Sequence, residues 1–279
     1  MMFKKIYVNG SSLSCGGSLE LDSPNYDYYV NQKSVKPWKS EKEVAYGNIL
    51  ANKLGIECFN DSKQGGGLDR IIRKTFDYID NLSEEEIRTT LFIFDIPLQP
   101  SRMELYSKEF QDHLVVSIYD REWENNVDGK MVRSNVSFSR SYKNPSLRLP
   151  YDTYMRHNLL ISKFAKEYYD YENETKRLVR QLILFYNFLD NKKITYNIDL
   201  NDSLFTASGQ NCDELSVIYK NNYSYKLNPN ILVMDTLWLL SVENNWRLCD
   251  EIEGSDDSHL GYYGNIKYAD YILDKLNKA

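Results

Sequence analysis

The sequence predicts an α/β fold, a three-layer α/β/α arrangement with a mainly parallel sheet. Short apolar segments typical of strands alternate along the chain with longer segments that have helical apolar spacing, which is the pattern of parallel α/β proteins. The segment Thr90–Ile96, TLFIFDI, is almost continuously apolar and is closed by Pro97, as expected of a strand buried on both faces. Gly264–Leu276 has the spacing of an amphipathic helix that covers such a sheet.

The predicted elements follow in chain order. The strands are Lys5–Val8, Ile56–Asn60, Thr90–Ile96 and Lys193–Ile198. The helices are Glu41–Leu54, which stops at Gly55; Leu68–Leu82, which Gly65-Gly66-Gly67 opens; Tyr151–Asn191, as two helices or one bent one; and Gly264–Leu276. Ser83 is expected to cap a helix that starts at Glu84-Glu85-Glu86. Asn230–Leu240 is either a helix or a buried apolar element.

We expect residues 1–279 to form a single domain with an insertion at 97–150. Two strands of the insertion, Leu114–Asp120 and Lys130–Ser139, are joined through Asn126-Val127-Asp128-Gly129, and Asp-Gly is a hairpin turn signal. The insertion is predicted to act as a lid or a docking hairpin. Because this hairpin is expected to be exposed, self-association into a homo-oligomer is also expected.

Composition excludes several classes of protein. The net charge of −6 and the pI near 5.3 disfavour sequence-independent nucleic-acid binding, which needs a basic face. No apolar run is long enough for a membrane span or a secretory signal, so a cytoplasmic protein is expected. The four cysteines are far apart and form no CxxC pair, which predicts reduced thiols without a disulfide framework or zinc site. No metal or cofactor is expected.

Chemistry is suggested by serines after the first strand and a histidine before the last helix. Gly10-Ser11-Ser12 follows the strand, and a serine becomes a nucleophile only with a base near it. Asp256 and Asp257 precede His259, and an acid on the same loop can orient the imidazole. The alternative is a solvated acidic loop with an incidental histidine. The other two histidines are expected to be structural or solvated.

The glycines at 65–67 lie between a predicted strand and a predicted helix. Backbone N–H groups at such a turn can stabilise a developing negative charge. The spacing is neither GxxxxGK[ST] nor GxGxxG, so a nucleotide-binding loop is disfavoured. The alternatives are a flexible turn or a phosphate site that uses Arg70.

These blocks, in this order, resemble the SGNH (GDSL) hydrolase family. Gly10-Ser11-Ser12-Leu13 is similar to its first block, Gly65 to its second-block glycine, and Asp256–His259 to its last block. The resemblance is closest to a phage and bacterial SGNH-like subgroup with an Asn-Gly-x-Ser first block, here Asn9–Ser12, and extends to Arg102-Met103-Glu104. It implies an SGNH or flavodoxin-like fold.

The resemblance also implies residue roles. Ser12 would attack a carbonyl carbon, His259 would be the base, and Asp256, or else Asp257, would orient it. Backbone N–H groups of Ser12 and Gly65 would be oxyanion donors. The family's third block, Gly-x-Asn-Asp, has no counterpart with an asparagine, and Gln99 or Arg102 would substitute. Arg102 and Glu104 would bind substrate or form an ion pair.

The function implied is that of a serine esterase, for example an O-deacetylase, acting on an acylated carbohydrate or small molecule. The alternative is a catalytically weak or inactive SGNH-like module, such as a phage structural or ligand-binding protein. The missing asparagine and the insertion favour that alternative. For a protein of phage origin, the host cytoplasm or the virion would be its location and a virion component a partner.

Overall fold

The main sheet has five strands, and every neighbouring pair in it is parallel. The computed structural model describes residues 3–17, 19, 41–97, 99–127, 130–140, 151–201, 231–233, 240, 243–247 and 259–278. The strand order is β2-β1-β3-β7-β8. Their bounds are β1 Lys5–Gly10, β2 Glu57–Asn60, β3 Thr90–Pro97, β7 Thr195–Asn201 and β8 Ile231–Val233. The helical alternative for the 230–240 segment is therefore wrong over Ile231–Val233, since these residues pair with β7.

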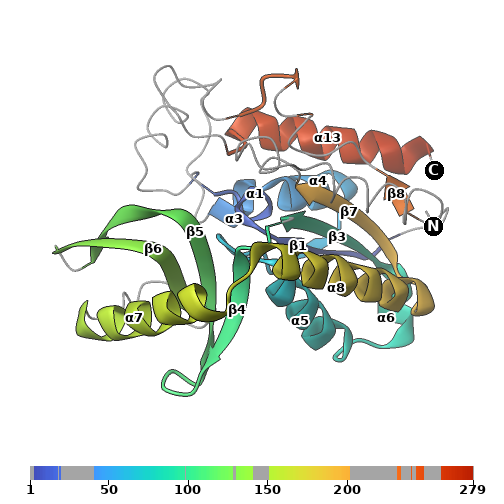
Figure 1. The fold of residues 1–279 in the computed structure, drawn as a ribbon. Helices are drawn as coiled ribbons and strands as arrows, with labels where there is room; N and C mark the ends of the chain where they lie inside the picture. The colour runs from blue at the N-terminus through green and yellow to red at the C-terminus, as the bar shows by residue number, and fades with distance from the viewer. Residues whose placement is uncertain are drawn as a thin grey trace.

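Helices cover both faces of this sheet, which confirms the predicted three-layer α/β/α fold (Figure 1). One face carries α4 and α13, and the other carries α5 and α8. Their bounds are α3 Glu41–Val44, α4 Tyr46–Leu54, α5 Leu68–Ile79, α6 Glu84–Thr89, α8 Tyr171–Asn191 and α13 Tyr262–Lys278.

Strand β3 explains why two cores form. All its residues are buried, and successive side chains point to opposite faces. Leu91 and Ile93 join the cluster with α4 and α13, whereas Phe92 and Phe94 join the cluster with α5 and α8. A strand buried on both faces is apolar at nearly every position, which is why the predicted segment shows no alternation.

The helix ends follow the sequence signals. Gly55 ends α4 in the left-handed conformation, with φ of 67°. Ser83 caps α6 through a capping box with Glu86, as predicted. The long helical stretch is two helices, α7 Tyr151–Tyr168 and α8, and the Asp170 side chain caps the start of the second. No helix in the described ranges is both long and apolar enough to cross a membrane.

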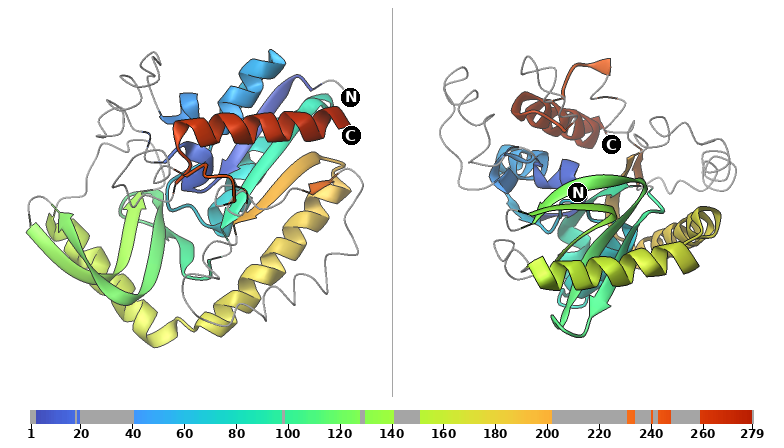
Figure 2. Two further views of the ribbon diagram at one scale, coloured as in Figure 1. Left: turned by 90° about the horizontal axis from the view of Figure 1, so that it is seen from above. Right: turned by 60° about the vertical axis from the view of Figure 1, so that its left-hand side comes forward.

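A second sheet of three antiparallel strands lies beside the main one, and α7 packs against it (Figure 2). Its strands are β4 Arg102–Ser107, β5 Asp112–Val127 and β6 Lys130–Arg140, in that order. The predicted hairpin is confirmed, since Val127 pairs with Lys130, and its strands are longer than expected. Val116, Val136 and Ile161 contribute to a separate core there.

Candidate functional site

The candidate nucleophile lies where the order of the strands reverses. The chain runs from β1 to β2 on one side and then returns to β3 on the other side of β1. In open parallel sheets, ligands bind in the crevice at the carboxyl ends of the strands at such a point. Helix α1, Ser12–Cys15, begins there directly after β1. The Ser12 side chain is partly exposed, and its hydroxyl makes no hydrogen bond to any described residue.

Gly10 allows β1 and β3 to approach each other beside this serine. It pairs with Asp95 across the sheet. A Cβ at Gly10 would lie 2.7 Å from Ser14 Oγ and 2.8 Å from both the Cβ and the carbonyl oxygen of Asp95. Glycine is therefore needed here for space.

Asp95 binds Ser11 and Ser14, which lie one residue before and two residues after Ser12, and no motif in the sequence points to this role. Its Oδ2 accepts hydrogen bonds from Ser11 N at 3.1 Å, from Ser11 Oγ at 2.6 Å and from Ser14 Oγ at 3.1 Å. The carboxyl group is completely buried, and its Oδ1 has no partner. The available signal was a single acid within an otherwise apolar strand, since a buried carboxyl group needs hydrogen-bond partners.

Burial raises the pKa of Asp95, and the hydrogen bonds from Ser11 and Ser14 oppose this. The folded protein thus holds this proton to a higher pH than the unfolded chain, whose ordinary Asp pKa is about 3.9. Protonation of Asp95 therefore stabilises the folded protein fully below the pKa of this group in the unfolded chain. This stabilisation is lost as pH rises through the pKa of Asp95 in the folded protein. We therefore expect the free energy of unfolding of Asp95→Asn, measured in urea, to increase relative to that of wild type as pH rises above about 4. A pH-independent difference would contradict the raised pKa.

His259 lies next to Ser12, although about 250 positions separate them in the sequence. Both side chains border Gly17: a Cβ placed there would lie 3.1 Å from His259 Cδ2 and 3.1 Å from Ser12 Cβ. His259 Cδ2 and Ser12 Cβ are therefore separated by no more than twice 3.1 Å. No hydrogen bond joins the Ser12 hydroxyl to the imidazole in this structure. Hydrogen bonds between catalytic groups are often long without substrate.

The glycine turn lies at the same end of β1. Gly65 has a φ of 72°, a conformation that favours glycine, and its neighbour is Val115 of the second sheet. A Cβ at Gly66 would lie 3.2 Å from the Gly10 carbonyl oxygen, and Lys63 N donates to that oxygen at 3.0 Å. The turn is thus held against the end of β1, two residues before Ser12.

The other predicted binding residues have different surroundings. Gln99 is buried after β3, and its carbonyl oxygen accepts a hydrogen bond from Arg102 N at 3.0 Å. The Arg102 backbone packs on the glycine turn, where a Cβ at Gly67 would lie 2.9 Å from the Arg102 oxygen. Glu104 accepts two hydrogen bonds of 2.7 Å from Arg73 of α5, and its side chain is 4% exposed. Glu104 thus anchors the second sheet to α5.

Arg70 does not extend toward a ligand at the glycine turn. Its side chain is 3% exposed and donates to Asn9 Oδ1 at 3.2 Å and to Asp61 Oδ1 at 3.3 Å. Lys74 Nζ lies 3.4 Å from the other oxygen of Asp61. Arg70 therefore belongs to an internal ion pair with Asp61. It does not serve as the cation of a phosphate site at the glycine turn.

The remaining candidate residues are the two acids before His259 and the two other histidines. Asp256 and Asp257 lie outside the described residues. His157 contacts Glu109 at 3.0 Å, and His113 packs edge-on against Tyr106, both in the region of the second sheet. In the part of the chain that the structure describes, no group of three His, Cys, Asp or Glu side chains could hold a metal.

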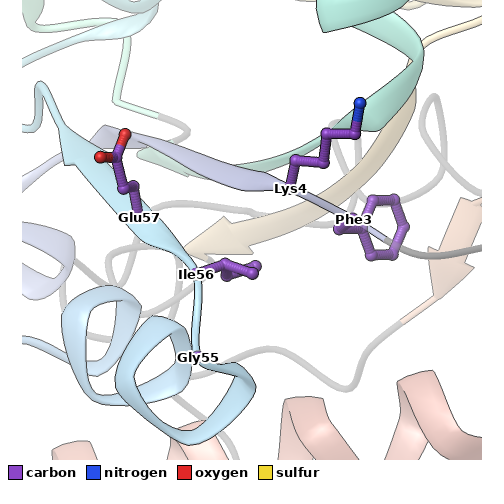
Figure 3. A pocket seen from close by; sticks show the side chains of 5 residues that line it. All are labelled: Phe3, Lys4, Gly55, Ile56 and Glu57. Carbon is purple, nitrogen blue, oxygen red and sulfur yellow. The ribbon is translucent and has the colours of Figure 1, made fainter.

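A cavity of about 610 Å³ lies at the opposite end of the strands. Phe3, Lys4, Gly55, Ile56 and Glu57 line it (Figure 3). These residues precede or begin β1 and β2, so the cavity is at the amino ends of these strands and is separate from Ser12.

Comparison by sequence found no matching protein-family model and no matching curated protein. Comparison by structure found a lipolytic protein of the G-D-S-L family from Desulfitobacterium hafniense, with TM-score 0.43 and 9% identity, covering 98% of this chain and 99% of that one. A carbohydrate esterase has TM-score 0.44 and 9% identity over 100% of this chain and 70% of its own. An acetyl xylan esterase from Butyrivibrio proteoclasticus has TM-score 0.40 and 13% identity over 99% and 65%.

Proposed function

We propose that this protein is an SGNH-type serine hydrolase, an esterase or O-deacetylase acting on an acylated carbohydrate or small molecule. Ser12 is the nucleophile, His259 is the general base, and Asp256 or Asp257 orients the imidazole. The observation that carries the proposal is the placement of Ser12 and His259 around Gly17, at the carboxyl end of β1. A base beside a serine hydroxyl is what nucleophilic catalysis requires.

Two kinds of donor are available for the oxyanion of the tetrahedral intermediate. Ser12 N is at the start of α1, and Gly65 is in the turn held against Gly10. The amide of Gln99 or the guanidinium of Arg102 takes the place of the third-block asparagine. Losing one such donor costs roughly 10²–10³-fold in turnover, so a slow enzyme is expected if neither side chain reaches the oxyanion.

The second candidate is a catalytically weak or inactive SGNH-like module that binds a ligand in the same crevice. The observation that favours it is the absence of a hydrogen bond between the Ser12 hydroxyl and His259. In that case, the second sheet beside the glycine turn serves as a docking surface, for a virion component or another copy of the chain.

Covalent labelling tests the proposal without knowledge of the natural substrate. A fluorophosphonate should phosphonylate wild type once, and peptide mass analysis should place the adduct on Ser12. Ser12→Ala should remain unlabelled, and short-chain p-nitrophenyl esters should be turned over by wild type only. Ser11→Ala is the matched control, because Ser11 is 1% exposed and bound to Asp95, and it should still be labelled. Wild type that is neither labelled nor active on these esters would favour the binding module.

A further inference from the structure

Tyr46, at the start of α4, connects two parts of the chain that carry the candidate catalytic groups. Its hydroxyl group lies 2.7 Å from Ser14 Oγ, two residues after Ser12. Its backbone N–H donates to Asn265 Oδ1 at 3.0 Å. Tyr46 is fully buried, and its ring packs edge-on against Tyr268 of α13 at 4.8 Å between centroids. One residue thus contacts the turn after the nucleophile and the helix after the histidine.

Asn265 completes this connection on the histidine side. Its Nδ2 donates to the carbonyl oxygens of Gly261 at 2.9 Å and Leu260 at 3.3 Å, the two residues after His259. Asn265 is fully buried, and all its side-chain hydrogen-bonding atoms have partners. A buried amide with three well-formed hydrogen bonds allows little change in the position of the groups it joins.

On the opposite side, Ser14 extends the connection to β3. Ser14 Oγ also donates to Asp95 Oδ2, and Asn60 Nδ2 donates to the Ser14 carbonyl oxygen at 2.9 Å. A continuous series of buried hydrogen bonds therefore runs from Asp95 through Ser14, Tyr46 and Asn265 to the loop after His259. Ser12 and His259 are attached at its two ends, and neither is a member of it.

We propose that Asn265 and Tyr46 are positioning residues that fix the distance between Ser12 and His259. This inference rests on the proposed function for its kinetic consequences, but its geometric content does not depend on activity. Neither side chain touches the substrate, since both are fully buried. A displacement of about 1 Å between reacting groups can cost about 10²-fold in rate, so a buried series of this kind can control turnover.

Two variants break the series at different places. Asn265→Asp keeps an acceptor for Tyr46 N but replaces the amide donor by an oxygen that faces two carbonyl oxygens. Tyr46→Phe keeps the ring, its packing on Tyr268 and the backbone bond to Asn265, and removes the hydroxyl group that bonds Ser14. Tyr46→Phe is thus the milder change and keeps the test possible if Asn265→Asp does not fold. Tyr271→Phe is the matched control, because Tyr271 is half-buried and also stacks on Tyr268, at 6.2 Å between centroids.

The first readout is the imidazole nitrogen resonances of the three histidines in ¹⁵N-histidine-labelled protein, with His259 assigned from a His259→Gln sample. Both variants should shift the His259 signals and leave those of His113 and His157 in place. Tyr271→Phe should shift none of them. Unchanged His259 signals in both variants would overturn the inference, whether or not the protein hydrolyses esters.

The second readout separates positioning from folding. With a p-nitrophenyl ester, kcat should fall about 10²-fold in Asn265→Asp and roughly tenfold in Tyr46→Phe, with little change in KM. The double variant should be no slower than Asn265→Asp alone, because an already broken series has little left to lose. Additive losses, or losses that only follow the fraction of folded protein, would mean a merely structural role. A wild type that is unlabelled and inactive would defeat the proposed function, and the resonances would still decide the inference.

Discussion

Replacing His259 by glutamine is expected to lower kcat for ester hydrolysis by roughly 10²–10⁴-fold, the range that general base catalysis contributes. Glutamine fills a similar volume but cannot accept the proton from Ser12. The rate of fluorophosphonate labelling at Ser12 should fall with kcat, because both reactions need the activated hydroxyl. The measurement is steady-state kinetics together with labelling monitored by intact mass.

His157→Gln is the matched control for this loss. His157 is one of only three histidines, and it contacts Glu109 in the region of the second sheet. Its replacement should leave kcat within about twofold, as expected for a residue away from the reacting atoms. Equal losses in the two variants would remove His259 from the role of base.

Replacing Gly264 by alanine is expected to reduce the free energy of unfolding by about 3 kcal/mol, the upper part of the usual range for overpacking. The new Cβ would lie 2.0 Å from the Trp246 carbonyl oxygen and 2.9 Å from its carbonyl carbon. Backbone atoms cannot turn away as a flexible side chain can. The same carbonyl oxygen accepts Gly261 N at 3.1 Å, so α13 must move away from Trp246, along with the loop that carries His259. Urea unfolding measures the loss.

Gly55→Ala is the control for a cost that comes from backbone conformation alone. Gly55 has a φ of 67°, and nothing lies within 4 Å of a Cβ placed on it. The expected loss is about 1–2 kcal/mol, the cost of the left-handed conformation for a residue with a side chain. Gly264→Ala should in addition lower kcat, and Gly55→Ala should not. A smaller loss of stability at Gly264 than at Gly55 would contradict the steric argument.

The sequence predicted the architecture because the architecture depends on local patterns. The apolar run of β3, the stop at Gly55 and the capping serine at position 83 are each recognisable within a few residues. The segment around Ile231 was ambiguous, since a short apolar run does not separate strand from helix. Its pairing with β7 shows that three of its residues, Ile231–Val233, form a strand.

The candidate site was predicted only where a motif carries it. The structure brings Ser12, Gly65 and His259 to one end of the sheet, as their order in the chain suggested, while their roles stay predictions. The network around them was not predictable, because its partners are remote: Ser11 and Asp95 are 84 positions apart, and Tyr46 and Asn265 are 219 apart. Which of the many serines meets Asp95 depends on the register that pairs Gly10 with Asp95.

The series from Asp95 to Asn265 has a consequence for the order of events during synthesis. A chain leaves the ribosome amino end first, at about 5–20 residues per second. The nucleophile turn, its carboxylate and the glycine turn are all made within the first 97 residues, whereas α13 begins only at Tyr262. Until α13 docks, the Tyr46 backbone N–H lacks its acceptor and Ser12 lacks its proposed base. A nascent chain halted before Tyr262 should therefore be inert toward fluorophosphonate, and reactivity should arise only once α13 has left the ribosome and docked.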